Sequence, residues 1–193
     1  IRCETDSIAE PIGFRTVRTQ GSQILLNDEP IFLRGVSLHE EVPFGPGRAW
    51  SEEHARTLLG WAVELGCNFV RLAHYPHNET MVRVAEELGL LVWAEIPVYW
   101  NIAWDHAPTL DCAKAQLGEL IARDRNRCSV ILWSLSNEAP ATEARQAFLA
   151  ELARCARVLD PTRLLTSALF ARLDQEAETM VIDDPVGEHL DVM

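Results

Sequence analysis

Residues 124–138 of the chain read DRNRCSVILWSLSNE, an apolar run that ends in a polar amide and a carboxylic acid. Its four consecutive apolar residues, 130–133, are typical of a strand buried on both faces, as in a parallel sheet covered by helices. Asn137 and Glu138 follow close behind this strand. Because parallel α/β proteins form their ligand sites at the carboxyl ends of their strands, we expect the chemistry at this junction. Glu138 is the candidate proton donor.

The alternation of strand and helix extends along most of the chain. Apolar segments are followed by amphipathic helices that begin at polar caps and end near glycine or proline. The predicted strands cover residues 32–38, 67–72, 90–96, 130–133 and 164–167, and the predicted helices cover residues 51–65, 78–88, 110–123 and 143–159. Such alternation predicts right-handed βαβ units and a parallel sheet. It amounts to about five strand–helix units, with a sixth beginning near residues 190–193.

The length leaves two parallel architectures open. A closed (β/α)8 barrel needs ~250 residues, so the 193 residues of this chain cannot close one. An open, doubly wound sheet fits the length better, but no glycine-rich phosphate-binding motif follows any strand. Residues 12–19 and 24–33 are predicted to form further strands around polar turns. The acidic segment 174–188 is expected on the surface.

Composition excludes several classes of protein. The chain has 17 Lys and Arg against 29 Asp and Glu, a net charge of −12, and no basic run, so we expect no nucleic acid partner. No stretch approaches the ~20 apolar residues of a membrane span, and the first residues do not resemble a signal peptide. The cysteines are widely spaced without a C-x-x-C pair, which favours reduced thiols over zinc or disulfides. They are Cys3, Cys67, Cys112, Cys128 and Cys155.

Polar side chains gather where the predicted strands end. Because the carboxyl ends of successive parallel strands share one mouth, we expect these side chains to meet there. Imidazole, guanidinium, amide and carboxyl groups together suit the recognition of hydroxyl groups and the handling of a proton. The candidate residues are His39, Arg71, His74, Glu95, Asn137 and Glu138.

Two long stretches resemble glycoside hydrolase family 2, the family of the β-galactosidases and β-glucuronidases. One is NFVRLAHYP at residues 68–76, with GLLVW at 89–93, and the other is DRNRCSVILWSLSNE at residues 124–138. The resemblance implies an α/β fold, a (β/α)8 TIM barrel that is incomplete here. It also implies that residues 1–20 are the end of a preceding immunoglobulin-like β-sandwich with its linker. Residues 21–193 would then form the N-terminal part of the barrel.

The resemblance also implies a retaining, exo-acting β-glycosidase, an O-glycosyl hydrolase. Glu138 matches the general acid/base of the family, and Asn137 matches the residue that binds the 2-hydroxyl of the sugar. Arg71 would pair with the nucleophile, and His39 and His74 would line the sugar subsite. The nucleophile of the family lies on a later, seventh strand, so the 193 residues alone are expected to be inactive.

Two further candidate substrate-binding residues have alternative roles. Glu95 either contacts the sugar or supports Arg71 or a histidine. Trp100, in the long loop after the third strand of the barrel, either stacks on a sugar face or packs against its own barrel, and the same alternatives hold for Trp104.

Neither a metal nor another cofactor is expected. Metal-dependent β-galactosidases have a Glu-x-His pair just beyond the third strand, where this chain has Val98-Tyr99-Trp100-Asn101. The difference favours β-glucuronidase-like over β-galactosidase-like members. The expected partners are a β-glycoside carbohydrate and, in the full-length protein, further copies of the same chain. The compartment stays open between cytoplasm and periplasm for a bacterial source.

Two other functional classes remain as alternatives. The chain could be a non-catalytic carbohydrate-binding or scaffolding relic of the barrel, which a natural stop codon after Met193 would support and a downstream strand ending in glutamate would contradict. A dinucleotide- or phosphate-binding α/β domain is disfavoured because the glycine-rich loop is missing.

Overall fold

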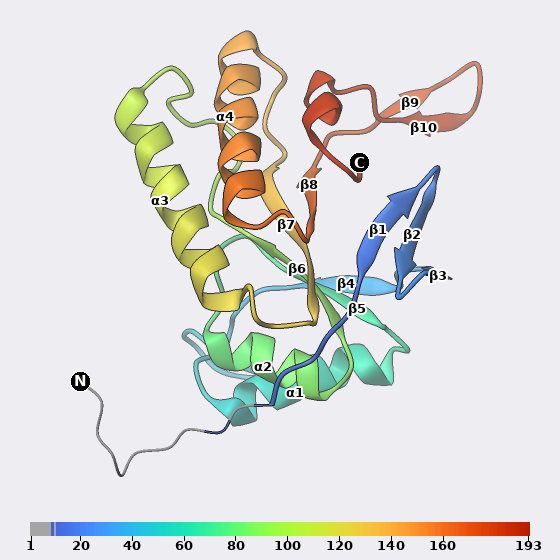
Figure 1. The fold of residues 1–193 in the computed structure, drawn as a ribbon, viewed down its shortest axis with the longest axis vertical. Helices are drawn as coiled ribbons and strands as arrows, with labels where there is room; N and C mark the ends of the chain where they lie inside the picture. Colours follow the sequence, from blue (N-terminus) through green and yellow to red (C-terminus); the bar gives the residue numbers. More distant parts are fainter. Residues whose placement is uncertain (1–8, 10) are drawn as a thin grey trace.

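The centre of the molecule is a five-stranded parallel sheet (Figure 1). The computed structural model describes residue 9 and residues 11–193. The strands lie side by side in sequence order: β4 (Gly35–Leu38), β5 (Phe69–Leu72), β6 (Leu91–Glu95), β7 (Val130–Asn137) and β8 (Leu164–Ala168). Each neighbouring pair is parallel, and within the described residues β4 and β8 are the edges of this sheet. Because the strand order follows the chain without the reversal of a doubly wound sheet, the fold is α/β, an incomplete (β/α)8 barrel, as the family resemblance implied.

A helix follows each of the first four strands of this sheet. Ser51, Asn78 and Thr142 each accept a hydrogen bond from a backbone N–H in the first turn of their helix, as good N-caps do. The third helix begins before the predicted residue 110, because Pro108 has no N–H to leave unpaired in a first turn. The helices are α1 (Glu52–Glu64), α2 (Glu79–Glu87), α3 (Ala107–Asp124) and α4 (Glu143–Leu159).

The main hydrophobic core lies between the sheet and these helices. Val70 in β5 and Val92 in β6 are fully buried there, against helix residues such as Leu117 and Leu149. Side chains alternate across a strand, so Arg71, next to Val70, faces the opposite side of the sheet. Burial of one face thereby directs the polar residues of β5 and β6 toward the inside of the incomplete barrel.

A three-stranded antiparallel sheet packs on the inner face of the parallel sheet. It contains β1 (Val17–Gln20), β2 (Gln23–Leu26) and β3 (Glu29–Ile31). Val17 and Ile24 contact a small buried cluster of residues 131, 132 and 164 at the start of β7 and β8. Residues 17–20, as β1, thus pair with β2 on the other side of residue 20. The domain boundary at residue 20 remains a prediction.

Residues 12–16 are not a strand, contrary to the sequence prediction for residues 12–19. The reason is Arg15, whose Nε and Nη2 donate to the carbonyl oxygens of Cys128 and Val130, at 3.1 and 2.6 Å. The segment is thus held to β7 by a side chain instead of by backbone pairing.

The acidic segment 174–188 lies largely on the surface, as predicted, with Val186 as its buried residue. The chain after β8 contains an exposed hairpin, β9 (Arg172–Asp174) and β10 (Thr179–Val181), which projects from the body in Figure 1. A 3-10 helix, η1 (Pro185–His189), follows and buries Val186. Residues 190–193 are not a strand, although the N–H groups of Asp191 and Val192 both donate to Leu165 O, at 2.9 and 3.2 Å. The predicted sixth strand is therefore present only as a short extended segment beside β8.

The described residues contain four free cysteines, and Cys3 lies outside the described residues. None of the helices in this part of the chain has the length and apolar character needed to cross a bilayer.

Asp160 is a buried carboxylate whose charge should make the stability of the fold depend on pH. It is 5% exposed, and it accepts hydrogen bonds from Thr162, Trp133 and Arg163. Burial alone would raise the pKa of Asp160, but these hydrogen bonds lower it overall. The carboxylate therefore stabilises the fold above the ordinary aspartate pKa of about 4, and this contribution is lost as the pH falls through the lower folded pKa.

Asp160→Asn is accordingly expected to be less stable than wild type by a constant amount above about pH 5, and the difference should shrink below about pH 4. Urea unfolding at a series of pH values measures it. A difference that stays constant down to about pH 2 would contradict this account of Asp160.

Candidate active site

The candidate site lies at the carboxyl ends of the parallel strands. Four neighbouring strands, or the positions that follow them, supply its residues: His39 after β4, Arg71 and His74 from β5 and its loop, Glu95 at the end of β6, and Asn137 and Glu138 at the end of β7. Residue 137 is the last residue of β7, because the strand continues beyond the predicted residue 133. The structure thus brings the predicted residues to one end of the sheet.

A buried ion pair forms the centre of the site. Nε and Nη2 of Arg71 each donate to one carboxylate oxygen of Glu95, with both distances 3.0 Å. Glu95 is 1% exposed, and its Oε2 also accepts from Trp93 Nε1 at 2.8 Å. The Arg71 guanidinium lies over the Trp93 ring, 4.9 Å from its centroid. A two-pronged pair of this kind fixes the orientation of both side chains.

The same arginine orients Asn137. Arg71 Nη2 donates to Asn137 Oδ1 at 2.6 Å, and the Asn137 backbone N–H donates to Val98 O at 2.9 Å. Because a guanidinium can only donate, the amide oxygen faces Arg71 and the amide NH2 group faces elsewhere. Arg71 therefore connects β5, β6 and β7 at their carboxyl ends.

His74 and His39 form the other side of the cluster. His74 Nδ1 lies 2.8 Å from Glu95 Oε1 and 3.1 Å from Arg71 Nη2. It accepts from Arg71 when Nδ1 is unprotonated, or donates to Glu95 when Nδ1 carries the proton. The His39 ring packs edge-on against His74 with 5.1 Å between ring centroids. Both imidazoles thus lie beside the Arg71–Glu95 pair.

These contacts bear on the two roles that the sequence left open for Glu95. Its carboxylate is buried and bonded by Arg71, His74 and Trp93, which favours support of the arginine over direct contact with a sugar.

Glu138 is exposed at the rim of the sheet. Its backbone N–H donates to Ala168 O at the end of β8, at 2.9 Å, and its φ of 47° lies in the left-handed region. Its Oε2 accepts from Trp100 Nε1 at 3.3 Å. The carboxyl group therefore points away from the helix-covered face, toward the side where the loops meet.

The two tryptophans of the loop after β6 differ. Trp100 is 62% exposed and contacts Glu138, whereas Trp104 packs edge-on against Phe148 of α4 with ring centroids 5.2 Å apart. For Trp104 the structure favours packing on its own barrel over contact with a sugar.

Arg145 is a residue near the site that sequence reasoning missed. It is fully buried in α4, and its Nη1 donates to Ala139 O at 3.1 Å and to Asp184 at 2.8 Å. Burial would raise the pKa of Asp184, but the hydrogen bond from Arg145 lowers it overall. The available signal was an arginine in helical register with Phe148, Leu149 and Leu152 on the buried face of α4.

Two further buried side chains, Glu40 and His77, have structural contacts. Glu40 accepts hydrogen bonds from Arg48 and from the backbone N–H of Asn78. His77 Nε2 lies 2.9 Å from Ala73 O, and burial lowers the pKa of this imidazole. These contacts hold the loops after β4 and β5 in place.

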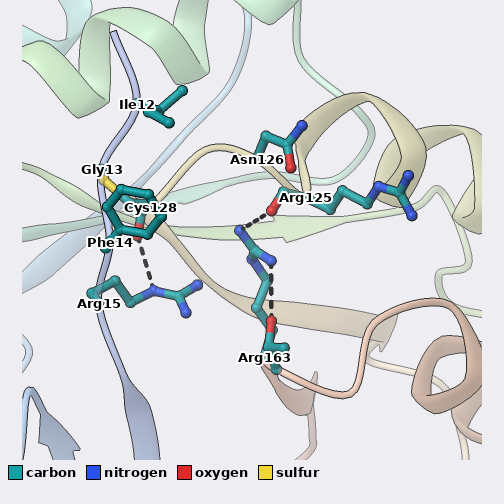
Figure 2. Close-up of a pocket in the computed structure, with 9 residues that line it drawn as sticks. Ile12, Gly13, Phe14, Arg15, Arg125, Asn126, Cys128 and Arg163 are labelled. Carbon is teal, nitrogen blue, oxygen red and sulfur yellow. Dashed lines mark hydrogen bonds between the residues drawn. The ribbon is translucent and has the colours of Figure 1, made fainter.

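A cavity of about 350 Å³ lies at the opposite end of the sheet (Figure 2). Arg15 and Arg163 line it, and both donate to backbone carbonyls, Arg163 to those of Arg125 and Arg127 at 2.8 Å. Burial and the nearby Arg163 charge lower the pKa of Arg15. The guanidinium groups of this cavity serve to hold loops at the amino ends of the strands, so it is separate from the candidate site.

Within residue 9 and residues 11–193, no group of three or more His, Cys, Asp or Glu side chains has the arrangement of a metal site. Residues 98–100 pair instead with the end of β7: Tyr99 bridges to Asn137, and Trp100 N–H donates to Asn137 O at 3.0 Å.

Comparison with known proteins shows the family of this chain. The family model for glycosyl hydrolases family 2, TIM barrel domain, matches residues 17–184. The β-glucuronidase of Paenibacillus borealis is 33% identical over 171 residues, which cover 80% of this chain and 28% of the relative. The apo structure of Bacteroides uniformis β-glucuronidase 3 has a TM-score of 0.74 at 38% identity, covering 81% of this chain and 21% of that one. The family 2 β-galacturonidase of Eisenbergiella tayi bound to galacturonate has a TM-score of 0.75 at 29% identity, covering 81% and 28%.

A parallel α/β sheet of this topology, with polar residues at the carboxyl ends of its strands, defines a TIM-barrel protein. The chain belongs to glycosyl hydrolase family 2, which confirms the resemblance seen in its sequence. It spans between 20% and 33% of the length of the first curated relatives that it matches.

Proposed function

We propose that the chain carries the acid/base and part of the sugar subsite of a retaining, exo-acting β-glycosidase. The observation that carries the proposal is the placement of Asn137 and Glu138 at the carboxyl end of β7, beside the Arg71–Glu95 pair, in a member of family 2. The buried ion pair gives the site a rigid frame, which catalytic groups need in order to act on a bound sugar without reorganising.

Glu138 acts first as an acid and then as a base. It protonates the glycosidic oxygen while a second carboxylate attacks the anomeric carbon and the bond from that carbon to the oxygen breaks. It then removes a proton from the water that releases the sugar. The second carboxylate is proposed on a later strand of the barrel, so residues 1–193 alone are expected to show no turnover.

Asn137 binds the 2-hydroxyl of the sugar. Arg71 occupies its amide oxygen, so the NH2 group is the part that can donate to a hydroxyl. Such a contact accelerates the reaction where it strengthens as the oxocarbenium-like transition state forms. His39 and His74 line the same subsite, and Arg71 supplies positive charge beside the attacking carboxylate.

The substrate class that we propose is a β-glucuronide. Support comes from relatives named β-glucuronidases and from the β-galacturonidase bound to galacturonate, which are proteins named for uronic acid sugars. A β-galactoside is the second substrate class of the family and serves as the comparison.

The test uses matched 4-nitrophenyl β-glucuronide and β-galactoside with the protein that carries this chain. We expect at least about a tenfold higher kcat/KM for the glucuronide, a ratio equivalent to ~1.4 kcal/mol. Proton NMR of the first-formed sugar should show the β anomer, since a retaining mechanism preserves the configuration. An α anomer would exclude the retaining mechanism. Sugar binding without hydrolysis of any aryl β-glycoside would support the non-catalytic relic instead.

A further inference from the structure

Trp100 approaches the candidate acid/base from the loop that follows β6. Its indole Nε1 donates a hydrogen bond to Glu138 Oε2, with 3.3 Å between the two atoms. The backbone beneath the indole is fixed, because Trp100 N–H donates to Asn137 O and Asn137 N–H donates to Val98 O. The ring therefore reaches Glu138 from a loop segment whose backbone is hydrogen-bonded to Asn137, the residue before Glu138.

Both partners of this hydrogen bond have left-handed backbone conformations. The φ angle is 58° at Trp100 and 47° at Glu138. Residues with side chains seldom adopt this region, and they persist in it where surrounding contacts require it, often at functional sites. The Tyr99 ring lies edge-on to the indole at 5.5 Å and 6.2 Å from the His74 ring. Aromatic contacts thus lead from the sugar subsite to the indole.

We propose that Trp100 is a positioning residue for Glu138, whose indole N–H fixes Oε2 so that Oε1 is the oxygen that transfers the proton. This proposal rests on the acid/base role proposed above. An indole N–H can only donate, so Oε2 accepts, and because an unprotonated oxygen accepts better than a protonated one, this hydrogen bond favours the exchangeable proton on Oε1. In the first step this proton passes to the glycosidic oxygen as its bond to the anomeric carbon breaks. In the second step Oε1 takes a proton from the attacking water.

Stacking on a sugar is the competing role for Trp100. The side chain is well exposed, so a ring face is open to a ligand. Stacking requires the ring but not the N–H, whereas positioning requires the N–H. Trp100→Phe keeps an aromatic ring and removes the donor, so it separates the two roles.

In the protein that carries this chain, Trp100→Phe is expected to lower kcat/KM about tenfold on a methyl β-glycoside, a loss typical of one hydrogen bond to a charged group. It should change kcat/KM little on the 4-nitrophenyl glycoside, whose leaving group departs without protonation. In a Glu138→Gln background, Trp100→Phe should have no further effect. Trp104→Phe is the matched control, because Trp104 packs on Phe148 away from Glu138.

The outcomes distinguish the two proposals. If Glu138→Gln shows no dependence on the leaving group, the acid/base role fails and the positioning role fails with it. If Glu138→Gln shows that dependence but the losses from the two substitutions multiply, only the positioning role is overturned. An equal loss on both glycosides, or a loss confined to KM, would also overturn it and assign the ring to sugar stacking.

Discussion

Glu138→Gln is expected to lose about 10²–10⁴-fold in kcat/KM on a methyl β-glycoside, the range typical of a general acid. The glutamine side chain has nearly the same shape but cannot release a proton to the glycosidic oxygen. On a 4-nitrophenyl glycoside the loss in kcat/KM should be much smaller, because that leaving group departs as a stable anion. On this 4-nitrophenyl glycoside kcat should fall more than kcat/KM, since the base that activates water in the second step is also missing.

Added azide provides a second measurement on the same variant. An anionic nucleophile needs no general base, so azide should restore kcat on the 4-nitrophenyl glycoside and release a glycosyl azide. Glu143→Gln is the matched control, since Glu143 is an exposed glutamate in the first turn of α4, a few residues beyond the site. Equal losses on both glycosides without azide rescue would remove Glu138 from the acid/base role.

Glu95→Gln is expected to destabilise the fold by about 3–5 kcal/mol, the cost of removing one partner of a buried ion pair. The amide cannot accept from both Arg71 nitrogens, and its NH2 group would face a guanidinium that only donates. Arg71 would remain as a poorly compensated charge beside His74. Because Arg71 orients Asn137, kcat/KM should fall as well.

Urea unfolding of the protein that carries this chain measures this loss of stability. The matched control is Glu87→Gln, whose carboxylate pairs with Arg56 at the surface, 2.5 Å away. Water screens an exposed pair, so the control should shift the unfolding midpoint far less. Similar shifts for the two variants would show that the Arg71–Glu95 pair is not a structural centre of the site.

The sequence predicted the elements of the fold well, because their signals are local. Helix α4 has the predicted bounds, since Thr142 caps its start and Pro161 follows its end. The positions of Arg71 and Asn137 followed from the rule that the carboxyl ends of parallel strands share one mouth. These arguments require no knowledge of contacts between distant segments.

Side-chain partnerships could not be predicted in this way. The burial of Glu95 depends on contacts with Arg71, Trp93 and His74, which the fold alone brings together. The strand predicted at residues 12–19 was too long because Arg15 finds its acceptors more than a hundred residues away. Alternation predicts which face of a strand a side chain lies on, but it does not identify the group with which that side chain forms a hydrogen bond.

Arg145 has a consequence for the variation of loops within this barrel. Its guanidinium donates hydrogen bonds to the carbonyl oxygen of Ala139, the residue after Glu138, and to Asp184, which lies past the β9–β10 hairpin. The hairpin leaves and rejoins the body between two anchored points, Ala168 and Asp184. We therefore expect changes in its length and sequence to leave the rim of the sheet unmoved. A hairpin transplanted from a relative is accordingly expected to be a modular exchange that leaves the Glu138 backbone in place.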